Sequence, residues 1–228
     1  EYVYDSVTGP KSLVAQSEIP RHVPTFAAGV RNALRRKPNI ILVGEARDRE
    51  TMSAAIEAGQ TGHLVFSTVH TIGVAATVRR IVSVFEPAER SERAFALMET
   101  LRMIVTQALV PKVGGGRLGL REYLVFDDNV REQLLDMPVE RWTYETQRFL
   151  VRYGRTMEQS ANAAFKEGLI DRRTYLMVSK GYTLDEDDLA LGEKPPSVED
   201  IAKDMEEAAD LADVEVISDI DDDDTTMI

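Results

Sequence analysis

Two short apolar runs, separated by a more polar stretch, dominate the first half of the chain. Residues 39–43 have the sequence Asn-Ile-Ile-Leu-Val, and residues 63–69 have the sequence His-Leu-Val-Phe-Ser-Thr-Val. Both runs predict strands, and the first is apolar enough to be buried on both faces. Between them, Asp48 can cap a helix with one apolar face. That face comprises Met52, Ala55, Ile56 and Gly59. The pattern predicts a strand–helix–strand unit.

Strand and helix patterns continue on both sides of this unit. The further predicted elements are a strand at 13–19, a helix at 25–36, helices at 73–85 and 88–107, and a hairpin at 108–113 and 117–126. Thr25 is the expected N-cap of the first helix. Because strands and helices alternate before a final hairpin, we expect an α/β fold. A largely parallel sheet would be flanked by helices and would carry an antiparallel edge.

Beyond residue 127 the pattern becomes helical, which divides the chain into three parts. We expect an α/β domain over residues 1–126, a helical region over 127–192 and an acidic, disordered tail over 193–228. The tail holds 14 acidic and 2 basic residues, so it accounts for the whole net charge of −12. The body is neutral, which disfavours nucleic-acid binding through a broad basic surface.

Composition excludes several classes of protein. The chain has no cysteine, so disulfides and thiolate metal sites are excluded. No apolar run reaches the roughly 18 residues of a membrane span, and we find no signal peptide. The sequence begins at Glu1 rather than at methionine, which is consistent with truncation or processing.

The carboxyl ends of the two central strands carry the strongest candidates for chemistry. Glu45 follows the first strand and His70 follows the second. Open α/β sheets bind their ligands at this edge. There a carboxylate can orient water for attack on a γ-phosphoryl group or help to hold Mg²⁺ through water, and an imidazole can contact a phosphate. The alternatives are a solvated turn acid and a structural histidine, but the Gly-Glu-x-Arg-Asp pattern specifies strand, turn and capped helix together.

His63 and Arg47 are weaker candidates, and the glycines at 114–116 are not a phosphate-binding loop. His63 lies seven residues before His70, so on one regular strand their side chains face opposite sides and do not share a metal. Arg47 is one of several arginines near this edge. An arginine there can neutralise phosphate charge across a subunit interface, although most are expected to be surface charges. The glycines at 114–116 lack a following Lys-Ser/Thr and predict a hairpin turn.

Two longer segments resemble signature boxes of the PilT-type secretion and pilus-retraction ATPases, in the RecA-like P-loop superfamily. Residues 40–48, Ile-Ile-Leu-Val-Gly-Glu-Ala-Arg-Asp, resemble the family's atypical Walker B box, in which Gly precedes the catalytic Glu. Residues 62–71, Gly-His-Leu-Val-Phe-Ser-Thr-Val-His-Thr, resemble its His box. Shorter matches lie at 33–38, 85–89, 114–117 and 167–170, so the resemblance covers about residues 1–180.

This resemblance implies a RecA-like sheet and the hydrolysis of ATP with Mg²⁺. The implied site residues are Glu45, His70 and Glu1 as catalytic groups and Gly44, His63 and Arg47 as nucleotide-contacting or sensing groups. Glu1 would end the family's Asp box, and Mg²⁺ would be reached through water rather than by a direct ligand. The chain contains no G-x-x-x-x-G-K-[ST] loop, which the family carries upstream. We therefore expect a carboxyl-terminal part of such an ATPase, which binds ATP poorly by itself.

Two departures from the family pattern favour one subclass. Residues 128–135, Asp-Asn-Val-Arg-Glu-Gln-Leu-Leu, differ from the AIRNLIRE-like motif of retraction motors, and the acidic extension is also unusual for them. Both favour the type IVB (Dot/Icm, DotB-like) or conjugative-transfer ATPases. The resemblance implies a cytoplasmic homo-hexamer, peripherally associated with inner-membrane secretion or pilus proteins, without specific nucleic-acid binding. The alternatives are a non-catalytic interaction module of a secretion complex and a DNA-handling conjugation motor.

Overall fold

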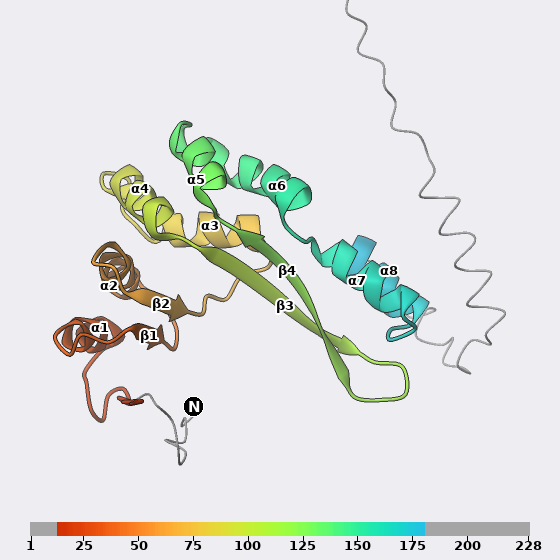
Figure 1. The fold of residues 1–228 in the computed structure, drawn as a ribbon, viewed down its shortest axis with the longest axis horizontal. Helices are drawn as coiled ribbons and strands as arrows, with labels where there is room; N and C mark the ends of the chain where they lie inside the picture. The colour runs from red at the N-terminus through yellow and green to blue at the C-terminus, as the bar shows by residue number, and fades with distance from the viewer. Residues whose placement is uncertain (1–12, 181–228) are drawn as a thin grey trace, which may run out of the picture.

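The computed structural model describes residues 13–180, which form two small sheets covered by helices (Figure 1). The elements are α1 (Phe26–Leu34), β1 (Ile40–Val43), α2 (Arg49–Gln60), β2 (Leu64–Ser67), α3 (Val74–Ser83), α4 (Arg90–Thr100), β3 (Met103–Pro111), β4 (Arg117–Val125), α5 (Asp128–Leu135), the 3₁₀ helix η1 (Val139–Arg141), α6 (Trp142–Tyr153), α7 (Met157–Lys166) and α8 (Arg172–Lys180). Glu1 and the predicted acidic tail lie outside the described residues. Within residues 13–180, no helix has the length and apolar character needed to cross a bilayer.

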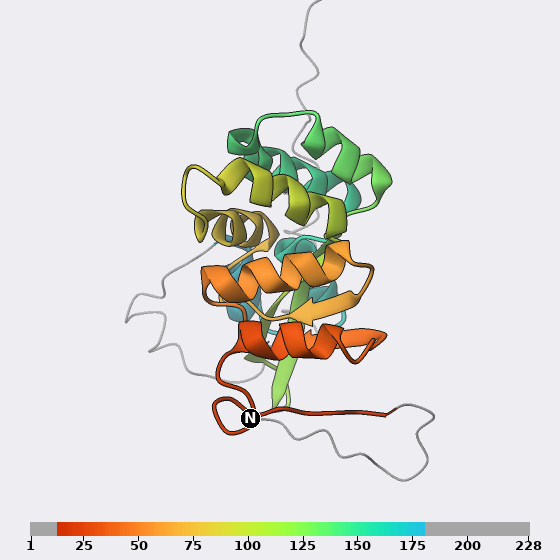
Figure 2. The same ribbon diagram turned by 90° about the vertical axis from the view of Figure 1, so that its left-hand side faces the viewer.

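β1, α2 and β2 form the strand–helix–strand unit that the sequence predicts. The two strands pair in parallel, with Ile40 opposite Leu64. Asp48 is the N-cap of α2, and Thr25 is the N-cap of α1, so both predicted caps are confirmed. Figure 2 shows α1 and α2 lying next to each other, and the two helices pack together in the structure.

α1 and α2 cover only one face of the β1–β2 pair. Their shared core consists of Ala27, Val30, Ile41, Val43, Ala54 and Ala58. On the opposite face, Ile40, Leu42 and Phe66 are 58%, 52% and 52% exposed. The prediction that β1 is buried on both faces is therefore wrong for the part of the chain described. Alternate side chains of a strand point to opposite faces, and no described helix packs on this one.

At the start of the described segment, residues 13–18 have no regular secondary structure, so the strand predicted at 13–19 is wrong. Residues 13–18 are all exposed, and Leu13 is 94% exposed. An apolar run becomes a strand only where a neighbouring strand accepts its backbone hydrogen bonds. Neither described sheet includes this segment.

The helix predicted at 88–107 ends earlier than expected. α4 stops at Thr100, and Ile104 and Val105 belong to β3. In β3, Ile104 is buried and Val105 is exposed, which is the two-residue alternation of a strand. Both residues are β-branched, so they fit a pleated strand better than a helix.

β3 and β4 form an antiparallel sheet of their own rather than an edge of the β1–β2 pair. Their register runs from Met103 opposite Val125 to Pro111 opposite Arg117. The connecting glycines at positions 114, 115 and 116 have φ values of 82°, 101° and 80°. These left-handed conformations suit glycine and confirm the predicted hairpin turn.

The helices that follow β4 fall into two groups (Figure 1). α5 and α6 pack with α3, α4 and the half of the hairpin that contains Ile104 and Leu124. These elements enclose a central cluster, whose largest fully buried side chains include Phe85, Met98, Phe126 and Trp142. α7 and α8 instead pack on the other half of the hairpin, next to its glycine turn. Their distal cluster comprises Val110, Leu120, Ala161, Ala164 and Ile170.

Candidate active site

The carboxyl ends of β1 and β2 are tied together beyond the last paired residues. The Thr68 hydroxyl donates a hydrogen bond to the carbonyl oxygen of Gly44 at 2.6 Å. The backbone N–H of Ala46 donates to the carbonyl oxygen of Thr68 at 3.1 Å. These two bonds hold the turn after β1 against the turn after β2. The predicted position of Gly44 at this edge is therefore observed, and Thr68 is a contributor that sequence reasoning missed.

Glu45 and His70 meet at this edge, as the strand order predicts. His70 Nε2 lies 3.1 Å from Glu45 Oε1, and Arg47 Nε contacts the same oxygen. The Glu45 side chain is 16% exposed, whereas the side chains of His70 and Arg47 are largely exposed. Oε1 itself is shielded from solvent and faces the Arg47 and His70 side chains.

The charge state of Glu45 is set mainly by its neighbours. The Arg47 guanidinium lowers the pKa of the Glu45 carboxyl below its ordinary value of 4.5, against the opposing effect of partial burial, and His70 adds a smaller lowering. Glu45 is therefore ionised at neutral pH. An ionised carboxylate at a strand end can accept a proton or a hydrogen bond from water.

Asp48 fixes the other end of the turn that carries Glu45. Asp48 Oδ1 accepts a hydrogen bond from the Thr51 N–H at 2.8 Å, and Oδ2 accepts one from the Thr51 hydroxyl at 2.9 Å. The Thr51 N–H is the main cause of the lowered pKa of Asp48. The ionised cap therefore stabilises the fold above the ordinary pKa of 3.8, and this contribution is lost as pH falls through the lowered value.

Asp48→Ala is expected to lower the free energy of unfolding by about 1 kcal/mol, because α2 loses its side-chain cap. Asp48→Asn is the matched control, since asparagine caps helices about as well as aspartate. Urea denaturation at neutral pH measures both variants. Equal losses in the two variants would show that the charge of Asp48, rather than its capping oxygen, is what matters.

Hydrogen bonds to the Thr77 side chain of α3 hold the turn after His70. The hydroxyl oxygens of Thr71 and Thr77 lie 2.6 Å apart, and the Thr77 hydroxyl donates to the carbonyl oxygen of Gly73 at 2.9 Å. Gly73 has a φ of 86°, which favours glycine. Sequence reasoning missed Thr77, although its position four residues after a helix-starting glycine suits a bond to that carbonyl oxygen.

The remaining predicted site residues do not join this pair within the described chain. His63 precedes β2, at the opposite end of the strand, and its Nδ1 lies 3.2 Å from the Thr61 hydroxyl. Glu1 lies outside the described residues. Among residues 13–180, no three His, Asp or Glu side chains converge to form a metal site. Glu45 offers an oxygen of the kind Mg²⁺ prefers, which fits contact through water rather than a protein cage.

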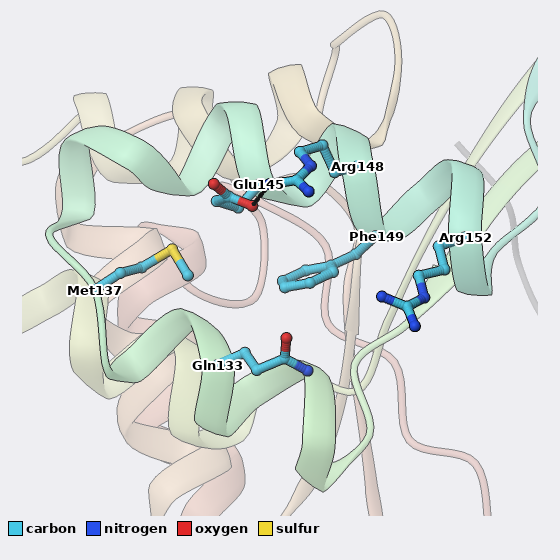
Figure 3. Close-up of a pocket in the computed structure, with 6 residues that line it drawn as sticks. All are labelled: Gln133, Met137, Glu145, Arg148, Phe149 and Arg152. Atoms are coloured by element: carbon cyan, nitrogen blue, oxygen red, sulfur yellow. Dashed lines mark hydrogen bonds and ion pairs between the residues drawn. The ribbon is translucent and has the colours of Figure 1, made fainter. Parts of the chain in front are cut away.

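A cavity of about 190 Å³ lies elsewhere, between α5 and α6 (Figure 3). It is lined by Gln133, Met137, Glu145, Arg148, Phe149 and Arg152. Figure 3 shows the ion pair between Glu145 and Arg148 at its side. The cavity shares no residue with the Glu45–His70 pair.

Comparisons with known proteins relate the chain to a family and to solved structures. A family model described as "Type II/IV secretion system protein" matches residues 3–115. The type IV pilus retraction ATPase PilT of Pseudomonas aeruginosa is 36% identical over 172 residues, which are 75% of this chain and 49% of the relative. The X-ray structure of the Legionella pneumophila ATPase DotB is similar with a TM-score of 0.76 and 48% identity, covering 79% of this chain and 49% of that one.

The crystal structure of the pilus retraction motor PilT with bound ADP is also similar, with a TM-score of 0.67, 33% identity and coverage of 81% of this chain and 51% of that one. The chain thus spans about half the length of the curated relatives it matches. The expected α/β, RecA-like fold is confirmed by these structural neighbours. The chain belongs to the PilT-like family of secretion and pilus ATPases, which includes the DotB-like ATPases.

Proposed function

We propose that this chain is the carboxyl-terminal part of an ATP-hydrolysing motor subunit that powers type IV secretion or pilus dynamics. The observation that carries the proposal is the Glu45–His70 pair at the shared end of β1 and β2. Support comes from relatives that are named as ATPases and from the ADP bound to PilT. Because the chain spans about half of these relatives, the activity is proposed for the complete protein.

In the proposed mechanism, Glu45 orients the attacking water in line with the γ-phosphoryl group. Its lowered pKa keeps the carboxylate ionised and able to accept a hydrogen bond from that water. Arg47 holds the carboxylate in place. Mg²⁺, bound with ATP, would neutralise charge on the phosphates. His70 would donate a hydrogen bond to a γ-phosphate oxygen. Release of that phosphate would therefore remove a contact of the turn before α3.

The proposed working form is a homo-hexamer at the cytoplasmic face of a membrane, peripherally bound to inner-membrane secretion or pilus proteins. The 48% identity to DotB supports the type IVB subclass over a retraction motor. A DNA-handling motor has less support, because residues 1–192 carry no net charge. A non-catalytic interaction module would hydrolyse no ATP even in the complete protein, so an ATPase assay with Mg²⁺ separates it from the motor.

His70→Ala in the complete protein is expected to lower kcat by about 10- to 100-fold, since a hydrogen bond to a charged group contributes about 1.5–3 kcal/mol. The measurement is steady-state ATP hydrolysis with excess Mg²⁺. His22→Ala is the matched control, because His22 is an exposed histidine that accepts a hydrogen bond from the Glu18 N–H in a loop before α1. If both variants retain full activity, His70 does not act on the phosphate.

A further inference from the structure

Glu122 on β4 joins the beginnings of two helices that are far apart in the chain. The residue is buried, with 9% of its surface exposed. Its Oε1 accepts a hydrogen bond from the Val74 N–H at 2.7 Å, and its Oε2 accepts one from the Met157 N–H at 3.2 Å. Val74 and Met157 are the first residues of α3 and α7. One buried carboxylate therefore serves two helix N-termini.

The two helices depend on this carboxylate to different degrees. Helix N-termini attract negative charge because their first N–H groups lack intrahelical partners. α3 begins after Gly73, which offers no capping side chain, so Glu122 takes the place of a cap there. α7 already has a capping box formed by Thr156 and Gln159. The hydrogen bond from the Met157 N–H to Glu122 is therefore additional to the capping box of α7.

The beginning of α3 is continuous with the turn that carries His70. Three residues separate His70 from the first residue of α3. The contacts of Thr77 with Thr71 and Gly73 make that turn part of the first turn of the helix. A Cβ added at Gly73 would lie 3.3 Å from Glu122 Oε1, so backbone and carboxylate are close. The turn that carries His70 and the start of α3 therefore lie directly against Glu122.

The beginning of α7 is fixed on the same strand. Tyr123 and Arg155 exchange two backbone hydrogen bonds of 2.9 Å each. A Cβ added at Gly154 would lie 2.5 Å from the carbonyl oxygen of Tyr123, so only glycine lets the chain pass β4 this closely. The junction between α6 and α7 is therefore held on β4, next to Glu122.

We propose that Glu122 is a positioning residue that holds the His70 turn and the first turn of α7 in one unit, so that nucleotide-dependent displacement at His70 reaches α7. The inference rests on the proposed function, since it takes His70 as the group that responds to nucleotide. The hydrogen bonds of Glu122 go to Val74 and Met157 rather than to Glu45 or His70. Its effect on the site passes through α3, and its effect on the helical region passes through α7.

Met157→Pro tests the α7 contact with little change to the helix itself. Proline is favoured at the first helical position and lacks the N–H that binds Oε2. The preceding Thr156 has φ −78° and ψ 159°, which is compatible with a following proline. Met157→Ala is the matched control, because it removes the same side chain and keeps the N–H. Both variants are made in the complete protein.

The measurement is amide hydrogen exchange of residues 68–77 and 161–166, with and without a non-hydrolysable ATP analogue and Mg²⁺. In the wild type and in Met157→Ala, nucleotide is expected to change exchange in both segments by about fivefold or more, the lower range of coupling between sites. In Met157→Pro, the change at 68–77 is expected to remain and the change at 161–166 to be lost.

Glu122→Gln removes the charge and leaves one carbonyl oxygen for two donors, so it breaks one of the two contacts. We expect kcat to fall about tenfold with the KM for ATP nearly unchanged. Glu145→Gln is the matched control (Figure 3). Glu145 is also a buried glutamate, but it pairs with Arg141 and Arg148 at 2.9 and 3.1 Å rather than with helix N-termini. This control is expected to keep the wild-type kcat. If Glu122→Gln fails to fold, the comparison of Met157→Pro with Met157→Ala still tests the proposal.

Two outcomes separate this inference from the proposed function. If nucleotide changes exchange at 161–166 equally in Met157→Pro and Met157→Ala, the coupling through Glu122 is overturned while the ATPase proposal stands. If nucleotide changes exchange at neither 68–77 nor 161–166 in the wild type, the nucleotide site itself is contradicted, and the signal to α7 is overturned with it.

Discussion

Glu45→Gln in the complete protein is expected to lose nearly all ATP hydrolysis while it continues to bind nucleotide. Glutamine keeps the size of the side chain but cannot take a proton from water. A positioned general base contributes about 10²- to 10⁴-fold, so kcat is expected to fall at least about 100-fold. Steady-state hydrolysis with Mg²⁺ measures the loss, and equilibrium binding of a non-hydrolysable ATP analogue shows whether the site persists.

The matched control is Glu57→Gln, which changes an exposed glutamate on α2. Glu57 lies 3.4 Å from Arg93, so it is also paired with an arginine, but it lies outside the candidate site. Surface ion pairs contribute about 0–1 kcal/mol to stability, and this variant is expected to hydrolyse ATP at the wild-type rate. Near-normal turnover in Glu45→Gln would show that the water is activated elsewhere.

The pH dependence of hydrolysis gives a second view of Glu45. Its pKa is lowered, chiefly by Arg47, so the ionised form is favoured in the folded protein. That preference stabilises the fold above the ordinary pKa of 4.5 and is lost as pH falls through the lowered value. An acidic loss of kcat that begins well above pH 4.5 therefore comes from another group.

Trp142→Ala is expected to have the largest effect on stability, a loss of about 3–5 kcal/mol in the free energy of unfolding. Trp142 is 1% exposed in the central cluster. Its indole packs edge-on against Phe95 with ring centroids 5.6 Å apart, and its Nε1 donates to the carbonyl oxygen of Met137 at 3.2 Å. The substitution leaves a cavity and an unpaired acceptor. Urea denaturation followed by far-UV circular dichroism measures the loss.

Tyr144→Ala is the control for Trp142→Ala, because it removes another aromatic side chain from α6. Tyr144 is 66% exposed, so its substitution is expected to change the free energy of unfolding by no more than about 0.5 kcal/mol. A loss below about 1 kcal/mol for Trp142→Ala would mean that the central cluster repacks around the gap.

The candidate site is the part of the structure that sequence reasoning predicts best, because its signals are local. The apolar run that ends in Gly44-Glu45 marks both a strand and its carboxyl end, and Asp48 marks the next helix within three residues. Parallel pairing of two such strands then brings Glu45 and His70 together. Each step needs only short-range spacing and the rule that helix-linked strands are parallel.

The packing around the site depends on partners distant in sequence, and there the sequence is less informative. Ile40 and Phe66 look like core residues, but their exposure depends on what packs against the sheet. Glu122 carries no local signal either, since it lies within β4 and its two partners are 48 and 35 residues away. A buried carboxylate in a strand becomes interpretable only when the helix N-termini that surround it are known.

The division of the core has a consequence for the cooperativity of unfolding. The central and distal clusters share no residue, and the hairpin supplies Ile104 and Leu124 to the first and Val110 and Leu120 to the second. Regions with separate cores can open in separate steps, even where hydrogen bonds such as those of Glu122 join them. The single tryptophan, Trp142, lies in the central cluster. A fluorescence midpoint therefore reports the melting of that unit, and α7 and α8 need a probe of their own.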